Sequence, residues 1–78
     1  MKLINHIKQH RARLDLTQQD LADRTGVRRQ AILAIEKEKY VPSALLAFQI
    51  ARELGMQVDE LFEMIEDNIG GDRNEEAE

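Results

Sequence analysis

Residues 16–40 read LTQQDLADRTGVRRQAILAIEKEKY and hold two short helical patterns, separated by a connection of about three residues. Thr17 stands before the first pattern and Asp20 follows three positions later. This is the spacing of a capping box, in which side chains satisfy the free backbone N–H groups at the start of a helix. Gly26 then tolerates the positive φ that a residue just past a helix end adopts. The sequence therefore predicts a helix over residues 18–25.

The second pattern covers residues 29–37 and is amphipathic, because each residue of a helix turns by about 100°. One side of this segment carries apolar residues, namely Ala31, Ile32 and Ile35. The opposite side carries Arg29, Gln30, Leu33 and Lys37, with Ala34 at the margin. An ordinary surface helix also has a polar outer face, so this pattern alone does not distinguish a binding surface from a solvated one.

The start of this second helix lacks the residue types that usually cap a helix. Arg28 occupies the position where Ser, Thr, Asp or Asn would cap the helix, and Arg29 follows directly. Two cations at the positive end of the helix dipole cost about 0.3–1 kcal/mol each, and the missing cap costs about 1 kcal/mol more. Such a penalty is expected where a polyanion supplies the negative charge, because phosphate oxygens accept from both the free N–H groups and the guanidinium groups.

Two further helical patterns flank these segments. The first covers about residues 5–15, and the second follows Pro42, with Ser43 as its cap, and stops at Gly55.

The C-terminal part begins with a fifth segment near Val58. Residues 62–66 fit either a continuation of that helix or a short strand, and the pattern does not decide between them. We expect one domain over residues 1–69, followed by an acidic, disordered tail over residues 70–78.

Composition excludes several classes of protein. The 78 residues include no Cys, which excludes a disulfide framework, a thiolate metal site and a cysteine nucleophile. The longest apolar run, residues 44–48, is far shorter than the roughly 20 residues that span a bilayer. No phosphate-binding glycine loop or catalytic triad is evident, so we expect no enzyme, no cofactor and no membrane partner. A reducing, cytoplasmic setting is the default expectation.

The net charge of −4 hides an uneven distribution. Residues 1–52 hold ten Lys/Arg and five Asp/Glu, whereas residues 53–78 hold one Arg and ten Asp/Glu. The first two-thirds of the chain are therefore basic, and the overall charge does not argue against a nucleic-acid partner.

The ordered set of motifs resembles the phage repressor/Cro family of helix-turn-helix proteins. The resemblance covers about residues 4–65 and is closest to small single-domain bacterial regulators. It is carried by Leu16-Thr17-Gln18-Gln19-Asp20-Leu21-Ala22, Gly26-Val27, Arg29-Gln30-Ala31-Ile32, Ile35-Glu36, Lys39-Tyr40-Val41-Pro42-Ser43, Ile50-Ala51-Arg52-Glu53-Leu54-Gly55 and Asp59-Glu60-Leu61-Phe62.

The resemblance implies an all-α fold of five helices, in which the segment over residues 29–37 lies in the major groove of double-stranded DNA. In some compact relatives the N-terminus pairs with a strand after the fifth helix, and the matching stretches here are residues 1–4 and 62–65. Arg11 and Glu36 match a pair that forms an internal salt bridge in relatives. The implied DNA contacts are Gln18, Arg29, Gln30, Leu33, Ala34, Lys37, Lys39 and Tyr40, and Arg28 adds a contact that the family motif does not guarantee.

The resemblance also implies roles for these contacts. Arg29 and Gln30 are placed for bidentate contacts to guanine and adenine, and Leu33 offers only apolar contact, for example to a thymine methyl group. Gln18 matches a phosphate-contacting position close enough to orient Arg29. Lys37, Lys39 and the Tyr40 hydroxyl fall in a loop that grips the sugar-phosphate backbone.

Three positions depart from the family pattern. Relatives often have Ser at the position of Arg28, a small polar residue at Leu33, and Gly or Asn at Glu38. Because Leu33 cannot form hydrogen bonds to bases, the resemblance does not define which base sequence is recognised. Glu38 must either adopt a costly left-handed backbone or give the end of the helix another shape.

The leading hypothesis is a dimeric, sequence-specific transcriptional regulator, a repressor of the Cro/C1 type. One alternative is the antitoxin of a toxin–antitoxin pair, which would bind a protein partner through its fifth helix or acidic tail. Another is a protein-interaction module without DNA binding. His6 and His10 are spaced for a metal but lack a third ligand, so we interpret them as surface residues. Exposed apolar residues would favour a second copy, and the candidates are Leu45, Met56, Met64 and Ile65.

Overall fold

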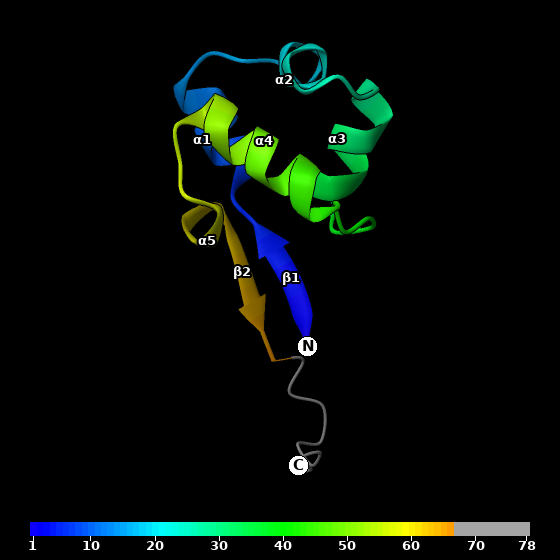
Figure 1. Ribbon diagram of the computed structural model, residues 1–78, viewed down its shortest axis with the longest axis vertical. Coiled ribbons are helices and arrows are strands. Elements are labelled where there is room, and N and C mark those ends of the chain that lie inside the picture. Colours follow the sequence, from blue (N-terminus) through cyan, green and yellow to red (C-terminus); the bar gives the residue numbers. More distant parts are fainter. Residues whose placement is uncertain (67–78) are drawn as a thin grey trace.

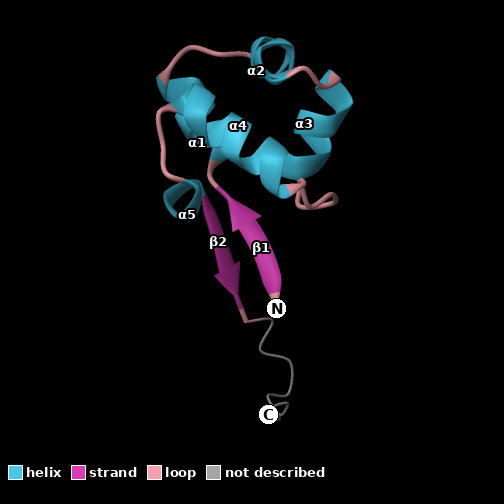
Figure 2. Ribbon diagram, viewed as in Figure 1, coloured by secondary structure: helices cyan, strands magenta, loops and turns pink. Residues whose placement is uncertain are grey.

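The computed structural model describes residues 1–66, which form five helices and two short strands. In chain order the elements are β1 (Lys2–Asn5), α1 (Ile7–Arg13), α2 (Gln18–Thr25), α3 (Arg29–Glu36), α4 (Ala44–Leu54), α5 (Val58–Leu61) and β2 (Phe62–Ile65). The helices form one body, and β1 and β2 project from it side by side (Figure 1; Figure 2). The expected five-helix fold with a small two-stranded sheet is confirmed. The acidic tail over residues 70–78 and the domain boundary at residue 69 lie outside the described residues.

Side chains cap the starts of α2 and α4 as the sequence predicts. The Thr17 hydroxyl accepts from the Asp20 N–H at 2.9 Å, and the Asp20 carboxylate accepts from the Thr17 N–H at 2.9 Å. That backbone hydrogen bond lowers the pKa of Asp20 below its usual value of 3.8. The Ser43 hydroxyl accepts from the Leu46 N–H at 3.1 Å. Each cap satisfies an N–H group that the helix itself leaves without a partner.

The first four helices all end in the same way. Each is followed by a residue in the left-handed region, namely Asp15 (φ 60°), Gly26 (φ 73°), Glu38 (φ 63°) and Gly55 (φ 69°). The next N–H group then bonds to a carbonyl five residues back, as in Lys39 N–H to Ala34 O at 2.9 Å. Of the two shapes left open for Glu38, the structure has the left-handed one.

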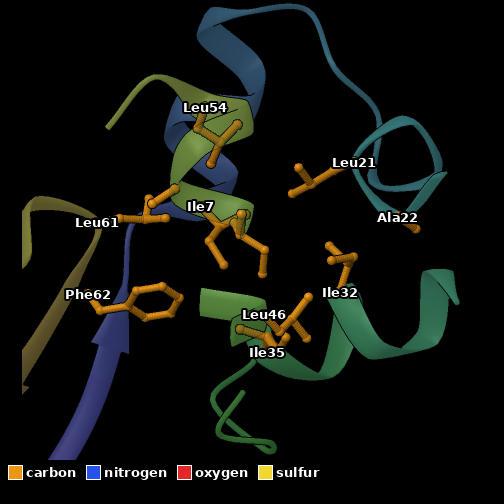
Figure 3. Packing of buried hydrophobic residues seen from close by; sticks show 11 residues of the cluster. Ile7, Leu21, Ala22, Ile32, Ile35, Leu46, Leu54, Leu61 and Phe62 are labelled. Carbon is orange, nitrogen blue, oxygen red and sulfur yellow. The ribbon is translucent and has the colours of Figure 1, made fainter. Parts of the chain in front are cut away.

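The core is aliphatic and lies where α2, α3 and α4 meet α1 and α5 (Figure 3). Ile7, Leu21, Ile32, Ile50 and Leu61 are fully buried. Burying such a side chain contributes about 1.5–3 kcal/mol. This packing fixes α3 by its apolar side, so the position of its outer face follows from the core. Among the aromatic residues only Phe62 belongs to this cluster.

The N-terminal boundary of α1 corrects the expected helix over residues 5–15, because Asn5 belongs to β1 and pairs with Phe62 across the sheet. The Asn5 side-chain oxygen accepts from the Ile7 N–H at 3.2 Å, so Asn5 precedes the helix rather than opening it. At the other end, Asp15 has left α1 with its positive φ.

The segment after α5 is a strand, which decides the alternative that the sequence left open. β1 and β2 are antiparallel, with Lys2 opposite Ile65 and Leu3 opposite Met64. Phe62 has an extended backbone (φ −115°, ψ 143°), and it is 7% exposed beside the helical core. Burial of this ring therefore accompanies the change from helix to strand.

Candidate nucleic-acid interface

Helices α2 and α3 form a helix-turn-helix unit around Gly26. Leu21 and Ala22 of α2 and Ile32 and Ile35 of α3 are buried in the common core. Because these residues take up one side of α3, its remaining side faces outward. The structure thus confirms the two faces predicted for this helix, which ends one residue earlier than expected, with Lys37 at its C-cap.

The start of α3 is exposed and has no side-chain cap. Arg28 occupies the N-cap with an extended backbone (φ −79°, ψ 152°), and its side chain makes no capping hydrogen bond. Arg28, Arg29 and Gln30 are all exposed. Within residues 1–66 neither arginine forms an ion pair or a side-chain hydrogen bond. Free N–H groups and two free guanidinium groups therefore meet at this end of the helix.

Further along α3, the outer face borders a groove against α1. Leu33 and Ala34 are half-buried, whereas Lys37 is exposed. Leu33 and Lys37 line a groove of about 630 Å³ whose other wall includes Lys8. Sequence reasoning did not select Lys8, because nothing in its local pattern shows that α1 lies beside α3.

The loop after α3 presents two lysines and a tyrosine to solvent. Lys37, Lys39 and Tyr40 are exposed, and Tyr40 retains 46% of its accessible surface. Glu38 lies between the lysines, but its carboxylate is 3.3 Å from the Lys2 ammonium group of β1. This ion pair offsets the negative charge that Glu38 brings to the loop.

A buried polar network fixes the other end of α3. Arg11 donates through Nε to Glu36 Oε2 at 2.8 Å and through Nη2 to Oε1 at 3.3 Å. Only 13% of the Arg11 side chain and 7% of the Glu36 side chain are exposed. Gln18 also donates to Glu36, at 3.1 Å. The internal pair expected from the resemblance is thus present. The Gln18 amide group donates to Glu36, and within residues 1–66 it forms no hydrogen bond with Arg29.

The unpaired charges on the outer side of α3 and its flanks are therefore all positive. Both nearby glutamates are paired, Glu36 with Arg11 and Glu38 with Lys2. Four cations of α3 and its flanks have no acidic partner in the part of the chain that the structure describes: Arg28, Arg29, Lys37 and Lys39. A surface of this kind attracts a polyanion even though the whole chain carries −4.

Other kinds of site receive no support from residues 1–66. Across that range no three His, Asp or Glu side chains are grouped as a metal site would need. His6 Nε2 lies 3.0 Å from Glu63 Oε1, and His10 Nδ1 lies 3.1 Å from Arg13 Nη2. None of the helices in the same range has the length and apolar character needed to cross a bilayer.

Residues 7–61 match the family described as Helix-turn-helix. An uncharacterised HTH-type transcriptional regulator of Methanothermobacter thermautotrophicus is 50% identical over 62 residues, which cover 78% of this chain and 90% of the relative. One from Methanocaldococcus jannaschii is 52% identical over 58 residues, 74% of this chain and 88% of the relative. The uncharacterised HTH-type transcriptional regulator YgzD of Bacillus subtilis is 42% identical over 64 residues, 82% of this chain and 97% of the relative.

Proposed function

Because the chain belongs to the helix-turn-helix family, we propose that it is a sequence-specific DNA-binding transcriptional regulator that acts as a dimer. The observation that carries this proposal is the set of unpaired cations along the outer side of α3, next to glutamates that are already neutralised. Double-stranded DNA offers phosphates for these cations, and its major groove is wide enough to admit a helix. We also propose a cytoplasmic location, because a DNA-binding regulator acts where its DNA lies.

In this proposal α3 is the recognition helix and reads base edges from its first turns. Arg29 and Gln30 make bidentate contacts, to guanine and adenine respectively. Leu33 and Ala34 are half-buried and apolar, and they contact thymine methyl groups. The remaining contacts hold the sugar-phosphate backbone, and they are Gln18, Arg28, Lys37, Lys39 and Tyr40.

The short recognition helix supports the proposal of a dimer. At about 1.5 Å per residue, the eight residues of α3 span only about 12 Å. That length reaches few base pairs, and a single small module buries a limited interface with DNA. Two copies on half-sites about one helical turn apart provide the affinity and specificity that one copy lacks.

Two matched variants test the proposed roles, after oligonucleotides that bind the wild type have been selected from a random pool. Arg29→Ala removes a base contact, so it should weaken binding to the selected site by about 1–3 kcal/mol and relax the preference at one base pair. Lys39→Ala removes a phosphate contact, so it should weaken binding to every sequence alike and lower the salt slope by about one unit. Fluorescence anisotropy titrations over a series of salt concentrations measure both effects.

The same titrations separate this function from the alternative of a protein-interaction module without DNA binding. If Arg29→Ala weakened binding to all sequences equally, Arg29 would not contact bases. If the wild type showed no salt-dependent binding to a random duplex at low salt, DNA binding would be rejected and a protein-interaction module favoured.

A further inference from the structure

Helix α4 exposes an apolar stripe on the side opposite the core. Leu46, Ile50 and Leu54 are buried, whereas Leu45 and Phe48, three residues apart on the other side, remain 70% and 64% exposed. Phe48 is one of three aromatic residues in the chain, and aromatic side chains are normally among the most buried. Its position in solvent points to a partner surface rather than to a role in the core.

The stripe continues into a groove between α4 and the start of α5. This groove has a volume of about 380 Å³, and its lining includes Leu45, Phe48, Arg52, Met56 and Val58. None of these residues belongs to the candidate DNA contacts. The groove and the candidate DNA interface are therefore made of separate sets of residues. Contiguous exposed apolar surface on so small a domain is typical of a protein–protein interface.

Charged residues at the margins of the groove identify the partner. Arg52 lines the groove, and Asp59 follows directly after Val58 at its α5 side. Both are exposed, and neither forms an ion pair with any other residue between 1 and 66. In a two-fold symmetric interface each residue pair occurs twice, so one surface with a cation and an anion at its margins is complementary to a second copy of itself.

Resting on the proposed function, in which two copies read two half-sites, we propose that a second copy of this chain occupies this groove. The apolar stripes of the two α4 helices bury each other, and Arg52 of each copy faces Asp59 of the other. The chain's own residues 67–78 are a poorer occupant, because Ile69 is their single apolar side chain larger than Ala. One such residue does not cover two exposed positions.

The apolar contact is tested by sedimentation equilibrium on the full chain without DNA. Phe48→Lys places a charge at the centre of the stripe and should raise the Kd for self-association at least tenfold. Val41→Lys is the matched control, because Val41 is 66% exposed and lies outside the groove, so its Kd should stay at the wild-type value. Both positions face solvent, and circular dichroism checks that each variant keeps its fold.

A charge swap tests the ion pair. Arg52→Glu brings a glutamate opposite Asp59, and Asp59→Arg brings an arginine opposite Arg52, so each single variant should weaken self-association about tenfold. The double variant restores opposite charges and should recover most of the wild-type affinity. A double variant as weak as the sum of the single ones would overturn this pairing.

Other results would overturn the occupant itself. A wild type that stays monomeric at concentrations where it saturates DNA, or a Phe48→Lys variant that associates like wild type, would show that a second copy does not fill the groove. Failure of the proposed function is a separate result, since a wild type that self-associates but binds no duplex would refute DNA binding and leave this interface standing.

Discussion

The two ends of α3 differ in whether their polar groups have partners within the protein. At its start, the side chains of Arg28 and Arg29 form no ion pair or hydrogen bond with any of residues 1–66, and no side chain caps the helix. At its end, Glu36 is nearly buried and is bound to Arg11 and Gln18, while the Asn5 side chain donates to the Ile35 carbonyl at 2.8 Å. One end is therefore fixed by the protein, and the other keeps its donors for an external ligand.

The start of α2 shows that the fold does not require this openness. Thr17 and Arg28 have nearly the same extended N-cap backbone, with φ of −79° at both positions. Thr17 completes a capping box, whereas Arg28 makes no cap hydrogen bond. Of these two N-cap positions with the same backbone shape, only the one at the start of α3 lacks a capping side chain. Such departures from local preference are expected at functional sites.

The largest effect is expected when the contrast between the two ends is broken by removing the buried network around Glu36 at the end of α3. Glu36→Ala leaves the nearly buried Arg11 without a counter-ion and Gln18 without its acceptor. Removing one partner of a buried pair is strongly destabilising, so the free energy of unfolding should fall by about 3 kcal/mol. Urea unfolding followed by circular dichroism measures the change.

Glu53→Ala is the control for an ion pair of a different kind. Arg24 and Glu53 are 3.9 Å apart, and 53% of the Arg24 side chain is exposed. Because surface pairs contribute little, this change should cost less than about 1 kcal/mol. Equal losses in the two variants would show that the Arg11–Glu36 network does not anchor α3.

A second change makes the open end resemble the capped one. In Arg28→Ser the backbone already suits a cap, so the new hydroxyl should bond to an N–H of the first turn and raise stability by about 1 kcal/mol. DNA binding should weaken, and the salt slope should fall by about one unit, because one phosphate contact is lost. Thermal unfolding and anisotropy titrations report the two effects.

The reverse substitution, Thr17→Arg, is the matched control. It removes a cap that the structure shows and should lower stability by about 1 kcal/mol. A gain in stability for Arg28→Ser without any loss of DNA affinity would mean that Arg28 does not contact phosphate.

The comparison also explains which features the sequence could predict. Signals within a few residues were sufficient for α2, whose bounds are as predicted, for the caps at Thr17 and Ser43, and for the glycine at the end of each capped helix. The missing cap at Arg28 was visible for the same reason. These features depend on local hydrogen bonds between neighbouring residues.

Features that depend on distant contacts were predicted only through the family resemblance, as for the Arg11–Glu36 pair, or they were missed or left open. Asn5 pairs with Phe62, and such a partner leaves no local trace, so the helix was expected to begin there. Lys8 lies beside α3 only because α1 packs there. Phe48 fits the helical pattern of α4, but its exposure depends on which residues α4 meets in the core. Leu33 was placed on the outer face, and the half-burial of that residue comes from the groove against α1.

The smallest expected effect concerns Glu38, where the anchored end of α3 meets the loop of Lys37 and Lys39. Its left-handed backbone costs about 1–2 kcal/mol for a residue with a Cβ atom. Glycine avoids that cost but loses about 0.5–1 kcal/mol of chain entropy, and the exposed pair with Lys2 contributes little. Glu38→Gly should therefore raise stability by only about 0.5 kcal/mol.

The effect of Glu38→Gly on DNA affinity separates charge from backbone strain. Removing a carboxylate beside two phosphate-contacting lysines should tighten binding about threefold at low salt, and less as the salt concentration rises. Glu38→Gln keeps the strained backbone and removes the charge, so it should show the same gain in affinity without the gain in stability. If neither variant bound DNA more tightly, the lysines of this loop would lie too far from phosphate to sense the charge, and the DNA contacts of α3 would be confined to its open start.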